Sequence, residues 1–371
     1  MSLTPSRRAL VTGGGAVALS AALPRSAAAA RIPPDARPLT PANVDSLMGA
    51  VGGNWVLTPG DYGGLSFYGK KMYQPDGPPN VIYGQPGVNI DYWFFDSCHN
   101  ITVRYITTRS GNGSQGGAGI GCSGSRNITF DHCRARGAGK SFSIRNTRNA
   151  TLTWCKAELT SGDGFALLSN QTLLVEDCWA DTLAGDFFDI FGCTDATVRR
   201  CLATNPQLSR DGHHPDSFQL SNDGPVRNNR VTLEYLNVDC ENGEWTQGPG
   251  FCDGSDNVTI RYVAGFGLGD NGLQLSDCNN CEVHDAFLQG QKFGSRITIR
   301  GKSDTVSIHD TRATLGVVDS HLDGPNRNVV LRNNASIPYA RNAGDRAAYL
   351  AFLAANPQIP TRAHWDDAGW V

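Results

Sequence analysis

Three aspartates, Asp186, Asp189 and Asp216, stand within or beside strand-like segments rich in phenylalanine. Carboxylates held close together repel one another, so one of them should keep its proton to a higher pH than the others. An acid of that kind can protonate a leaving oxygen, while a neighbouring carboxylate activates water or attacks directly. The three residues therefore predict acid–base cleavage of a glycosidic bond.

Two histidines, His213 and His214, come shortly before Asp216 and complete the predicted catalytic set. Residues on neighbouring repeats are expected to bind the substrate: Gln219, Glu244, Trp245, Asp270, Gln274, Lys292, Arg296 and Arg300. The sequence specifies no cofactor; Ca²⁺ stays an open alternative because hard cations bind carboxylates, but no ligand frame marks a site. For Asp163 a turn-capping role is favoured, since Asp at repeat corners often bonds backbone N–H groups.

The elements that must position these residues are short repeated strands. One phrase recurs, in which two β-branched or aliphatic residues flank a polar one and a cysteine follows. The cysteines Cys133, Cys155, Cys178 and Cys201 lie 22, 23 and 23 residues apart. A single coil of this period cannot bury its own apolar face. Successive coils therefore stack about 4.8 Å apart, so that residues of the same type lie on top of one another. The repeat predicts an all-β fold, a right-handed parallel β-helix solenoid, with most of the eleven cysteines in its core.

A second strand phrase follows each copy of the first, with large apolar residues at alternate places. Period two indicates one inward and one outward face. The inward pairs include Phe142/Ile144, Phe165/Leu167, Phe188/Ile190 and Phe218/Leu220. The residue after each inward position should face outward, which gives the row Ser143, Ala166, Asp189, Gln219, Cys252, Gln274 and Thr298. Two longer segments, 201–219 and 241–249, are expected to wall a groove over this outer face.

The ends of the chain carry different signals. Residues 1–30 contain a twin-arginine pattern and small-residue cleavage sites, so they predict a signal peptide and a periplasmic or secreted protein. Residues 31–79 are expected to form an N-terminal cap with the first strands, 80–335 the β-helix catalytic domain, and 336–371 a C-terminal helical cap. Helices expected over 41–51 and 345–355 would plug the two ends.

Charge and hydropathy exclude two classes of partner. The net charge is −3 with acids and bases interspersed, which does not give the clustered basic face of a nucleic-acid-binding protein. Outside the N-terminal signal, the sequence has no apolar run long enough to span a membrane. The expected partner is a polysaccharide or oligosaccharide substrate, and the oligomeric state is not specified.

At these residues the sequence resembles the pectin-lyase-like β-helix superfamily and, within it, the polygalacturonases of glycoside hydrolase family 28. Gly185-Asp186-Phe187-Phe188-Asp189 is similar to that family's Asn-Thr-Asp-Gly-x-Asp strand, and Pro215-Asp216-Ser217-Phe218 to its Asp-Asp strand. The resemblance implies that Asp186 and Asp216 are catalytic, with Asp189 beside them. Pro249-Gly250-Phe251 stands where the family has Gly-His-Gly, and Gln274-Leu275-Ser276 stands where it has Arg-Ile-Lys.

Two other functions stay open at this point. A lyase or epimerase acting on a uronic-acid polymer needs a base for the C5 proton and positive charge near the sugar carboxylate. His213, His214, Lys292, Arg296 and Arg300 could supply both. Alternatively, a non-catalytic carbohydrate-binding solenoid would use Trp245 and other exposed aromatic residues as a stacking platform.

Overall fold

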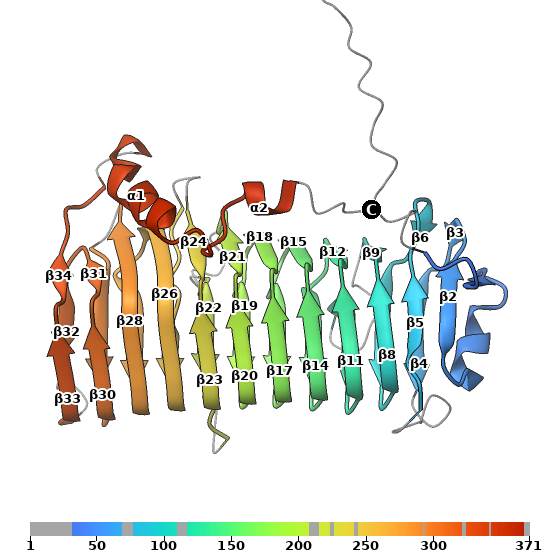
Figure 1. Cartoon of the computed structure of the whole chain (residues 1–371), viewed down its shortest axis with the longest axis horizontal. Helices are drawn as coiled ribbons and strands as arrows, with labels where there is room; N and C mark the ends of the chain where they lie inside the picture. The colour runs from blue at the N-terminus through green and yellow to red at the C-terminus, as the bar shows by residue number, and fades with distance from the viewer. Residues whose placement is uncertain are drawn as a thin grey trace, which may run out of the picture.

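The computed structural model describes residues 32–68, 77–109, 117–207, 215–222, 226–240, 244–291, 294–320, 324–340 and 343–366. Within these residues the chain winds into a parallel β-helix, whose strands pair between successive coils in an 11-stranded and a 21-stranded sheet. The coils lie side by side along the long axis from the N-terminal to the C-terminal end (Figure 1). The predicted solenoid is therefore confirmed, while residues 1–31, which include the expected signal peptide, lie outside the described residues.

The 11-stranded sheet takes one strand from each coil. Its strands are β4 (Gly64–Tyr68), β7 (Tyr92–Asp96), β10 (Ala118–Ser123), β13 (Lys140–Arg145), β16 (Phe165–Leu168), β19 (Phe188–Phe191), β22 (Phe218–Ser221), β25 (Phe251–Asp253), β27 (Asn271–Ser276), β29 (Arg296–Arg300) and β32 (Val317–Asp319).

The 21-stranded sheet bends, so that most coils contribute two strands to it. The row before the bend is β1 (Arg37–Leu39), β2 (Gly53–Leu57), β5 (Asn80–Tyr83), β8 (His99–Arg104), β11 (Arg126–Asp131), β14 (Arg148–Thr153), β17 (Gln171–Glu176), β20 (Thr194–Arg199), β23 (Asn229–Glu234), β26 (Asp256–Leu268), β28 (Asn279–Gly290), β30 (Asp304–His309) and β33 (Arg327–Arg332). The row after it is β9 (Thr107–Thr108), β12 (Arg134–Arg136), β15 (Lys156–Thr160), β18 (Trp179–Leu183), β21 (Leu202–Thr204), β24 (Asn237–Asp239), β31 (Arg312–Ala313) and β34 (Ala335–Ser336), and the long strands β26 and β28 continue through it.

The remaining elements are short. A small two-stranded sheet joins β3 (Gly60–Asp61) to β6 (Val88–Asn89). The helical segments are η2 (Val44–Gly49), η4 (Ala343–Arg346), α1 (Ala347–Ala355) and α2 (Ala363–Asp366). None of the helices in the described ranges is long and apolar enough to cross a membrane.

Stacking of like residues holds the core together, as the repeat predicts. The rings of Phe142, Phe165, Phe188 and Phe218 form one stack, with centroids 4.8, 4.6 and 4.5 Å apart. All eleven cysteines are buried free thiols, and the strand register places Cys133, Cys155, Cys178 and Cys201 in one file. The prediction that the cysteines are core residues is confirmed.

An asparagine precedes several copies of the repeated strand phrase, and its backbone conformation explains why. Asn127, Asn149, Asn257 and Asn280 all have φ between 53° and 57°, a left-handed conformation that Asn tolerates better than most residues with a Cβ. Their side chains also bond along the row, with Asn149 Nδ2 donating to Asn127 Oδ1 at 2.8 Å. The same residue type therefore shapes each corner and links it to the next coil.

A buried asparagine closes another corner, between the 11-stranded sheet and the next strand. Asn170 is fully buried; its Oδ1 accepts from the Thr147 N–H at 3.0 Å, and its Nδ2 donates to the Ile144 carbonyl at 2.8 Å. We expect Asn170→Ala to lower the free energy of unfolding by about 2–3 kcal/mol, because two buried backbone groups lose their partners. Urea unfolding measures this, and Asn54→Ala at a partly buried site, where the side chain bonds Asp35, is the control. Equal midpoints for the two variants would contradict the assigned role.

The two ends of the solenoid differ. At the N-terminal end η2 covers the core with the buried side chains of Val44 and Leu47, although it is a short 3-10 helix and not the longer helix expected over 41–51. At the other end Leu331 pairs in register with the fully buried Ile308, yet it is 43% exposed. The expectation that the C-terminal helix plugs this end is wrong.

The C-terminal helix lies instead along the side of the solenoid (Figure 1). Tyr349 of α1 is buried against Phe266 of β26 and Phe287 of β28, and its hydroxyl donates to Asn237 Oδ1 at 2.7 Å. Farther along, Trp365 of α2 packs on Trp179 of β18. An apolar stripe on a helix fits any apolar surface, and here the aromatic rings of β26 and β28 bury it better than the small last coil does.

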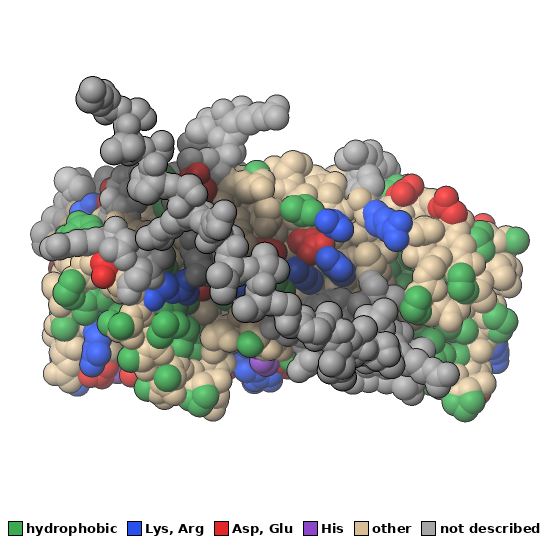
Figure 2. All heavy atoms as spheres, turned by 90° about the horizontal axis from the view of Figure 1, so that it is seen from above, with side chains coloured by type: hydrophobic (Ala, Val, Ile, Leu, Met, Phe, Trp, Pro, Cys, Tyr) green, Lys and Arg blue, Asp and Glu red, His purple; other side chains and the backbone are tan. Residues whose placement is uncertain are grey.

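The face that carries α1 and α2 also shows acidic and basic side chains gathered beside one another near the middle of the long axis (Figure 2). On this face the carboxylate of Glu158 on β15 is 6% exposed and contacts Lys156 Nζ at 3.0 Å and the guanidinium of Arg134. Burial raises the pKa of Glu158, but Lys156 and Arg134 hold it below its usual value overall. This carboxylate is thus ionised and paired, which is the pattern of a structural ion pair.

Candidate active site

The outer face of the 11-stranded sheet carries Asp189. In register, Asp189 of β19 lies between Ala166 of β16 and Gln219 of β22. Its strand neighbours Phe188 and Ile190 point into the core and are fully buried. The alternation that the sequence predicts therefore places this carboxylate outward, over the middle of the solenoid.

A row of charged residues runs along the corner just before this sheet. Lys140, Asp163, Asp186 and Asp216 occupy equivalent positions in four successive coils, because each is two residues before a phenylalanine of the stack. Backbone bonds connect the corners, with Gly164 N–H donating to the Asp186 carbonyl at 2.8 Å and Phe187 N–H to the Asp216 carbonyl at 2.9 Å. The corner sits beside Asp189, so the structure brings Asp186, Asp189 and Asp216 into one neighbourhood.

Asp186 is the carboxyl with the most perturbed protonation. Its Oδ1 accepts a hydrogen bond from the Asp216 backbone N–H at 2.8 Å, which lies in the next coil and not in its own turn. Burial raises the pKa of Asp186 to about 8, with further contributions from the charges of Asp216, Asp163 and Asp189. At neutral pH this side chain holds a proton and can donate it.

Asp189 is held by a different environment. Its Oδ1 accepts a hydrogen bond from the Ser221 hydroxyl at 3.0 Å. The pKa of Asp189 is raised overall: burial raises it most and the charge of Asp163 adds to the rise, while the Ser221 hydrogen bond and the charge of Lys140 oppose it. Asp189 thus combines an outward-facing carboxylate with a donor that fixes its orientation.

Asp216 is nearly fully buried, at 3% exposure, where two segments meet. It forms a β-bridge with Gln247, and Thr246 Oγ1 donates to the Pro215 carbonyl at 2.5 Å. These contacts tie the described ends of the segments before β22 and β25 together. From this position the charge of Asp216 acts on both Asp186 and Asp189.

The predicted orientation of Phe251 and Cys252 is wrong, and the correct register adds Phe251 and Asp253 to the candidate site. Phe251 pairs with Gln219 and faces outward, while Cys252 pairs with Leu220 and is fully buried. The longer segment before β25 shifts the alternation by one place, so Cys252 takes the inward position expected for Phe251. As a result Phe251 offers an aromatic ring on the outer face, and Asp253 adds a fifth carboxyl to those of Asp163, Asp186, Asp189 and Asp216. The pKa of Asp253 is raised overall by burial, although the charge of Arg300 opposes the rise.

Beyond Phe251 the outer face becomes basic and rich in unused hydrogen-bonding groups. Gln274 is fully buried; its Nε2 donates to Asp253 Oδ1 at 3.4 Å, and its Oε1 has no partner. Thr298 Oγ1, Arg296 Nε and Arg300 Nε are likewise buried atoms without a hydrogen-bond partner. Buried polar atoms of this kind usually acquire partners from water or a ligand.

The other predicted site residues have mixed placements. His213, His214 and Lys292 lie outside the described residues. Trp245 is partly buried, and its ring lies so close to Gly269 that a Cβ added there would meet it at 2.5 Å. Glu244 is partly buried, and Asp270 is exposed, in the coil that precedes Arg296.

Asp163 does not have the role favoured from the sequence. Its Oδ2 accepts a hydrogen bond from Lys140 Nζ at 2.5 Å, one coil earlier. The side chain is therefore used in an ion pair between coils, and the turn-capping interpretation is wrong. This pairing could be predicted from the repeat, because Lys140 and Asp163 are 23 residues apart and residues one period apart lie side by side in a solenoid.

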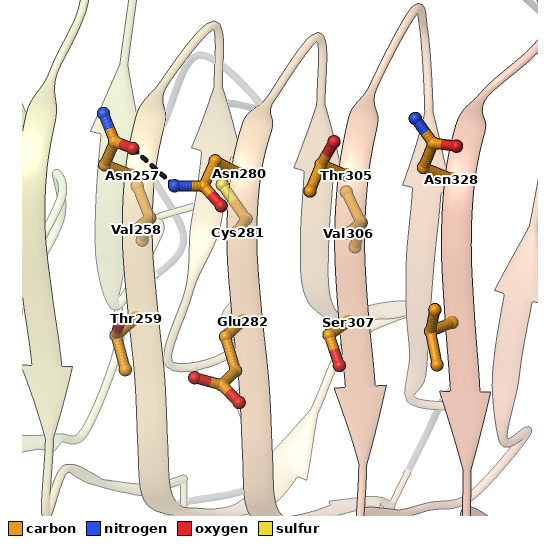
Figure 3. Close-up of a pocket in the computed structure, with 11 residues that line it drawn as sticks. Asn257, Val258, Thr259, Asn280, Cys281, Glu282, Thr305, Val306, Ser307 and Asn328 are labelled. Atoms are coloured by element: carbon orange, nitrogen blue, oxygen red, sulfur yellow. Dashed lines mark hydrogen bonds between the residues drawn. The ribbon is translucent and has the colours of Figure 1, made fainter.

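A surface hollow on the other sheet is a poorer candidate. It has a volume of about 380 Å³ and lies on β26, β28, β30 and β33 of the other sheet (Figure 3). Its lining is mostly Asn, Thr, Ser and Val, and its one carboxylate, Glu282, pairs with His309 at 3.2 Å. The hollow has no second acid for proton transfer, so the charge arrangement over β19 and β22 identifies the candidate site better than the shape does.

The Ca²⁺ alternative gains no ligand set from the part of the chain that the structure describes. Across those ranges, no group of three or more His, Cys, Asp or Glu side chains is arranged to hold a metal ion. The acid cluster can instead support proton transfer, because the Asp186 carboxyl, whose pKa is raised, lies beside the Asp189 carboxyl, which accepts a hydrogen bond from Ser221.

Comparison with known proteins identifies the fold. A family model described as "Right handed beta helix region" matches residues 93–231. The A-module of mannuronan C-5 epimerase AlgE6 from Azotobacter vinelandii superposes with a TM-score of 0.55 at 17% identity, covering 80% of this chain and 94% of that one. The AlgE4 A-module from the same organism gives a TM-score of 0.51 at 13% identity, covering 81% and 93%. No curated protein matches the sequence. The right-handed parallel β-helix is confirmed, and the chemistry must be argued from the site.

Proposed function

We propose that this protein is an enzyme that cleaves glycosidic bonds in a polysaccharide or oligosaccharide bound over β19, β22 and β25. The observation that carries the proposal is the pairing of Asp186, whose pKa is raised to about 8, with the outward-facing carboxylate of Asp189. Glycoside hydrolysis needs one carboxyl that keeps its proton and another that is ionised. Export by the twin-arginine route, as the N-terminal residues predict, would bring such an enzyme to polymeric substrates.

The roles follow from the two environments. Asp186 gives its proton to the glycosidic oxygen as the bond to the anomeric carbon breaks. Asp189, oriented by Ser221, either takes a proton from the attacking water or attacks the anomeric carbon itself. Burial, with the charge of Asp216, raises the pKa of Asp186 so that it keeps its proton, and the Asp216 N–H donates to Asp186 Oδ1. Retention or inversion at the anomeric carbon distinguishes the two roles of Asp189.

A second candidate is elimination or epimerisation at C5 of a uronic-acid unit. The buried, unpartnered Nε atoms of Arg296 and Arg300 favour it, because guanidinium groups bind sugar carboxylates and stabilise an enolate-like intermediate. Two solved structures that share the fold, the A-modules of AlgE6 and AlgE4, are mannuronan C-5 epimerases. The hydrolase is preferred because the acid pair is better defined than a base at C5.

One assay separates these candidates. The purified protein is incubated with neutral and acidic polysaccharides, and reducing ends, absorbance of the unsaturated product and deuterium uptake from heavy water are followed. Reducing ends alone support hydrolysis. Reducing ends with the ultraviolet band indicate a lyase, and deuterium uptake without chain cleavage indicates an epimerase. No reaction on any polymer, combined with tight binding, would favour a carbohydrate-binding solenoid.

Phe251 should act as a sugar platform beside the acids. It faces outward next to Gln219 and Gln274 and is only partly buried. We expect Phe251→Ala to raise KM by about 3–10-fold with little change in kcat, because stacking binds ground state and transition state alike. Phe251→Tyr keeps the ring and should retain the original KM. Steady-state kinetics on a polymer that the wild type degrades measures both, and an unchanged KM in the alanine variant would remove Phe251 from the substrate site.

A further inference from the structure

The acid cluster has a single lysine at its edge among the described residues of the corner row. Lys140 occupies the same corner position as Asp163, Asp186 and Asp216, one coil before the first of them. Its Nζ lies 2.5 Å from Asp163 Oδ2, and its side chain is 30% exposed. Successive coils are about 4.8 Å apart, so the pair begins a row of one cation and three carboxyls.

The groups around Asp186 and Asp189 come from three coils. Asp163 faces Asp186 from the coil before, and Asp216 from the coil after, while Asp189 belongs to the same strand segment. Asp189 is affected by Asp163, Lys140 and Asp216, and by the hydroxyl of Ser221. Lys140 is thus the described cation that opposes the accumulated negative charge at Asp189.

We infer that Lys140 and Asp163 are positioning residues of this site, whose ion pair in the corner row sets the charge that the carboxyls of Asp186 and Asp189 experience. This inference rests on the proposed function, because it gives the two carboxyls their acid and base roles. Neither residue is required to touch the substrate. The pair acts through charge, because the negative charge of Asp163 raises the pKa of both neighbouring carboxyls and the positive charge of Lys140 opposes that rise at Asp189.

Removal of either partner should therefore have opposite effects. Lys140→Met leaves the Asp163 carboxylate unopposed, so the pKa values of Asp186 and Asp189 should rise. Asp163→Asn removes a negative charge and leaves the lysine, so both pKa values should fall. Two charges about 8 Å apart near a protein surface interact enough to shift a pKa by about one unit. In the double variant the pKa values should lie between those of the two single variants, and Lys140→Arg should keep the wild-type values.

The test is a titration of the whole protein labelled with ¹³C at the aspartate carboxyl carbons, followed by NMR. It needs no substrate, so it can succeed or fail independently of the polysaccharide assay. Lys156→Met is the matched control, because Lys156 also pairs with a carboxylate, Glu158 at 3.0 Å, but on the other sheet. It should leave the signals of Asp186 and Asp189 unchanged.

Opposite shifts in the two single variants, with intermediate pKa values in the double variant, would establish the inference. Shifts of the same sign, or no resolvable shift at Asp189 in Lys140→Met, would overturn it. A loss of packing moves signals throughout the protein and does not reverse sign between the two variants, so structural damage cannot imitate the expected result. If the polysaccharide assay detects turnover, the acidic limb of the pH–rate profile should move upward in Lys140→Met and downward in Asp163→Asn.

Discussion

Asp189→Asn is expected to lower kcat by about 100- to 10,000-fold, the range that a general base or acid contributes. The substitution removes the carboxyl group but keeps its shape, and the Ser221 hydroxyl can still donate to the amide oxygen as it does to Asp189 Oδ1 at 3.0 Å. KM should change little, because the carboxylate acts on the reacting atoms more than on the bound sugar. Single-turnover kinetics with the polymer that the wild type degrades measures the effect.

A matched control is available on the other sheet. Asp195 is exposed on β20 and pairs with Arg230 at 2.5 Å, so Asp195→Asn makes the same chemical change away from the site. It should keep wild-type kcat. If Asp189→Asn retained activity similar to that of the control, Asp189 would not be the base or the nucleophile.

Asp186→Asn should make the protein more stable while removing its activity. The pKa of the carboxyl is about 8 in the folded protein because of burial and the charge of Asp216, against about 3.9 in an unfolded chain. Folding must therefore keep this group protonated over that pH range, and stability falls by up to about 1.4 kcal/mol per pH unit as pH rises from about 4 to about 8. An amide is neutral at every pH, so at pH 7 the variant should gain on the order of 4 kcal/mol.

The pH dependence is the diagnostic part of this prediction. Near pH 4 the wild-type carboxyl is protonated in most folded molecules, so the gain should nearly vanish there. Asp131→Asn provides a contrast: burial raises the pKa of Asp131, but the His132 hydrogen bond and the charge of Arg104 lower it overall. That variant should lose stability at neutral pH. Urea unfolding at several pH values measures both, and a destabilised Asp186→Asn at pH 7 would contradict the assigned protonation.

Much of the fold follows from the spacing of a few residue types. The cysteine period and the alternation of Phe142, Phe165, Phe188 and Phe218 fix the coil length and the inward face, because stacked coils bury only residues that repeat in register. The same register brings Asp186 and Asp216 together, although they are 30 residues apart. A solenoid turns sequence period into spatial proximity, so these features can be predicted without coordinates.

The features that the sequence does not predict depend on departures from the period. The longer segment before β25 moves Cys252 inward and Phe251 outward, and a strand phrase with an aromatic residue at the usual place gives no warning of that shift. The outward position of Asp253 could not be predicted for the same reason. The docking of α1 on the side of the solenoid depends on the surface shape around Phe266 and Phe287, which no local pattern encodes.

The central claim is that sugar chains react over Asp186 and Asp189, and a crystal structure of Asp189→Asn with a bound oligosaccharide of the identified substrate tests it most directly. The account predicts that a glycosidic oxygen lies about 3 Å from the Asp186 carboxyl, with a sugar ring against Phe251. An oligosaccharide seated instead in the hollow on β26, β28, β30 and β33, with no sugar atom near Asp186, would contradict it.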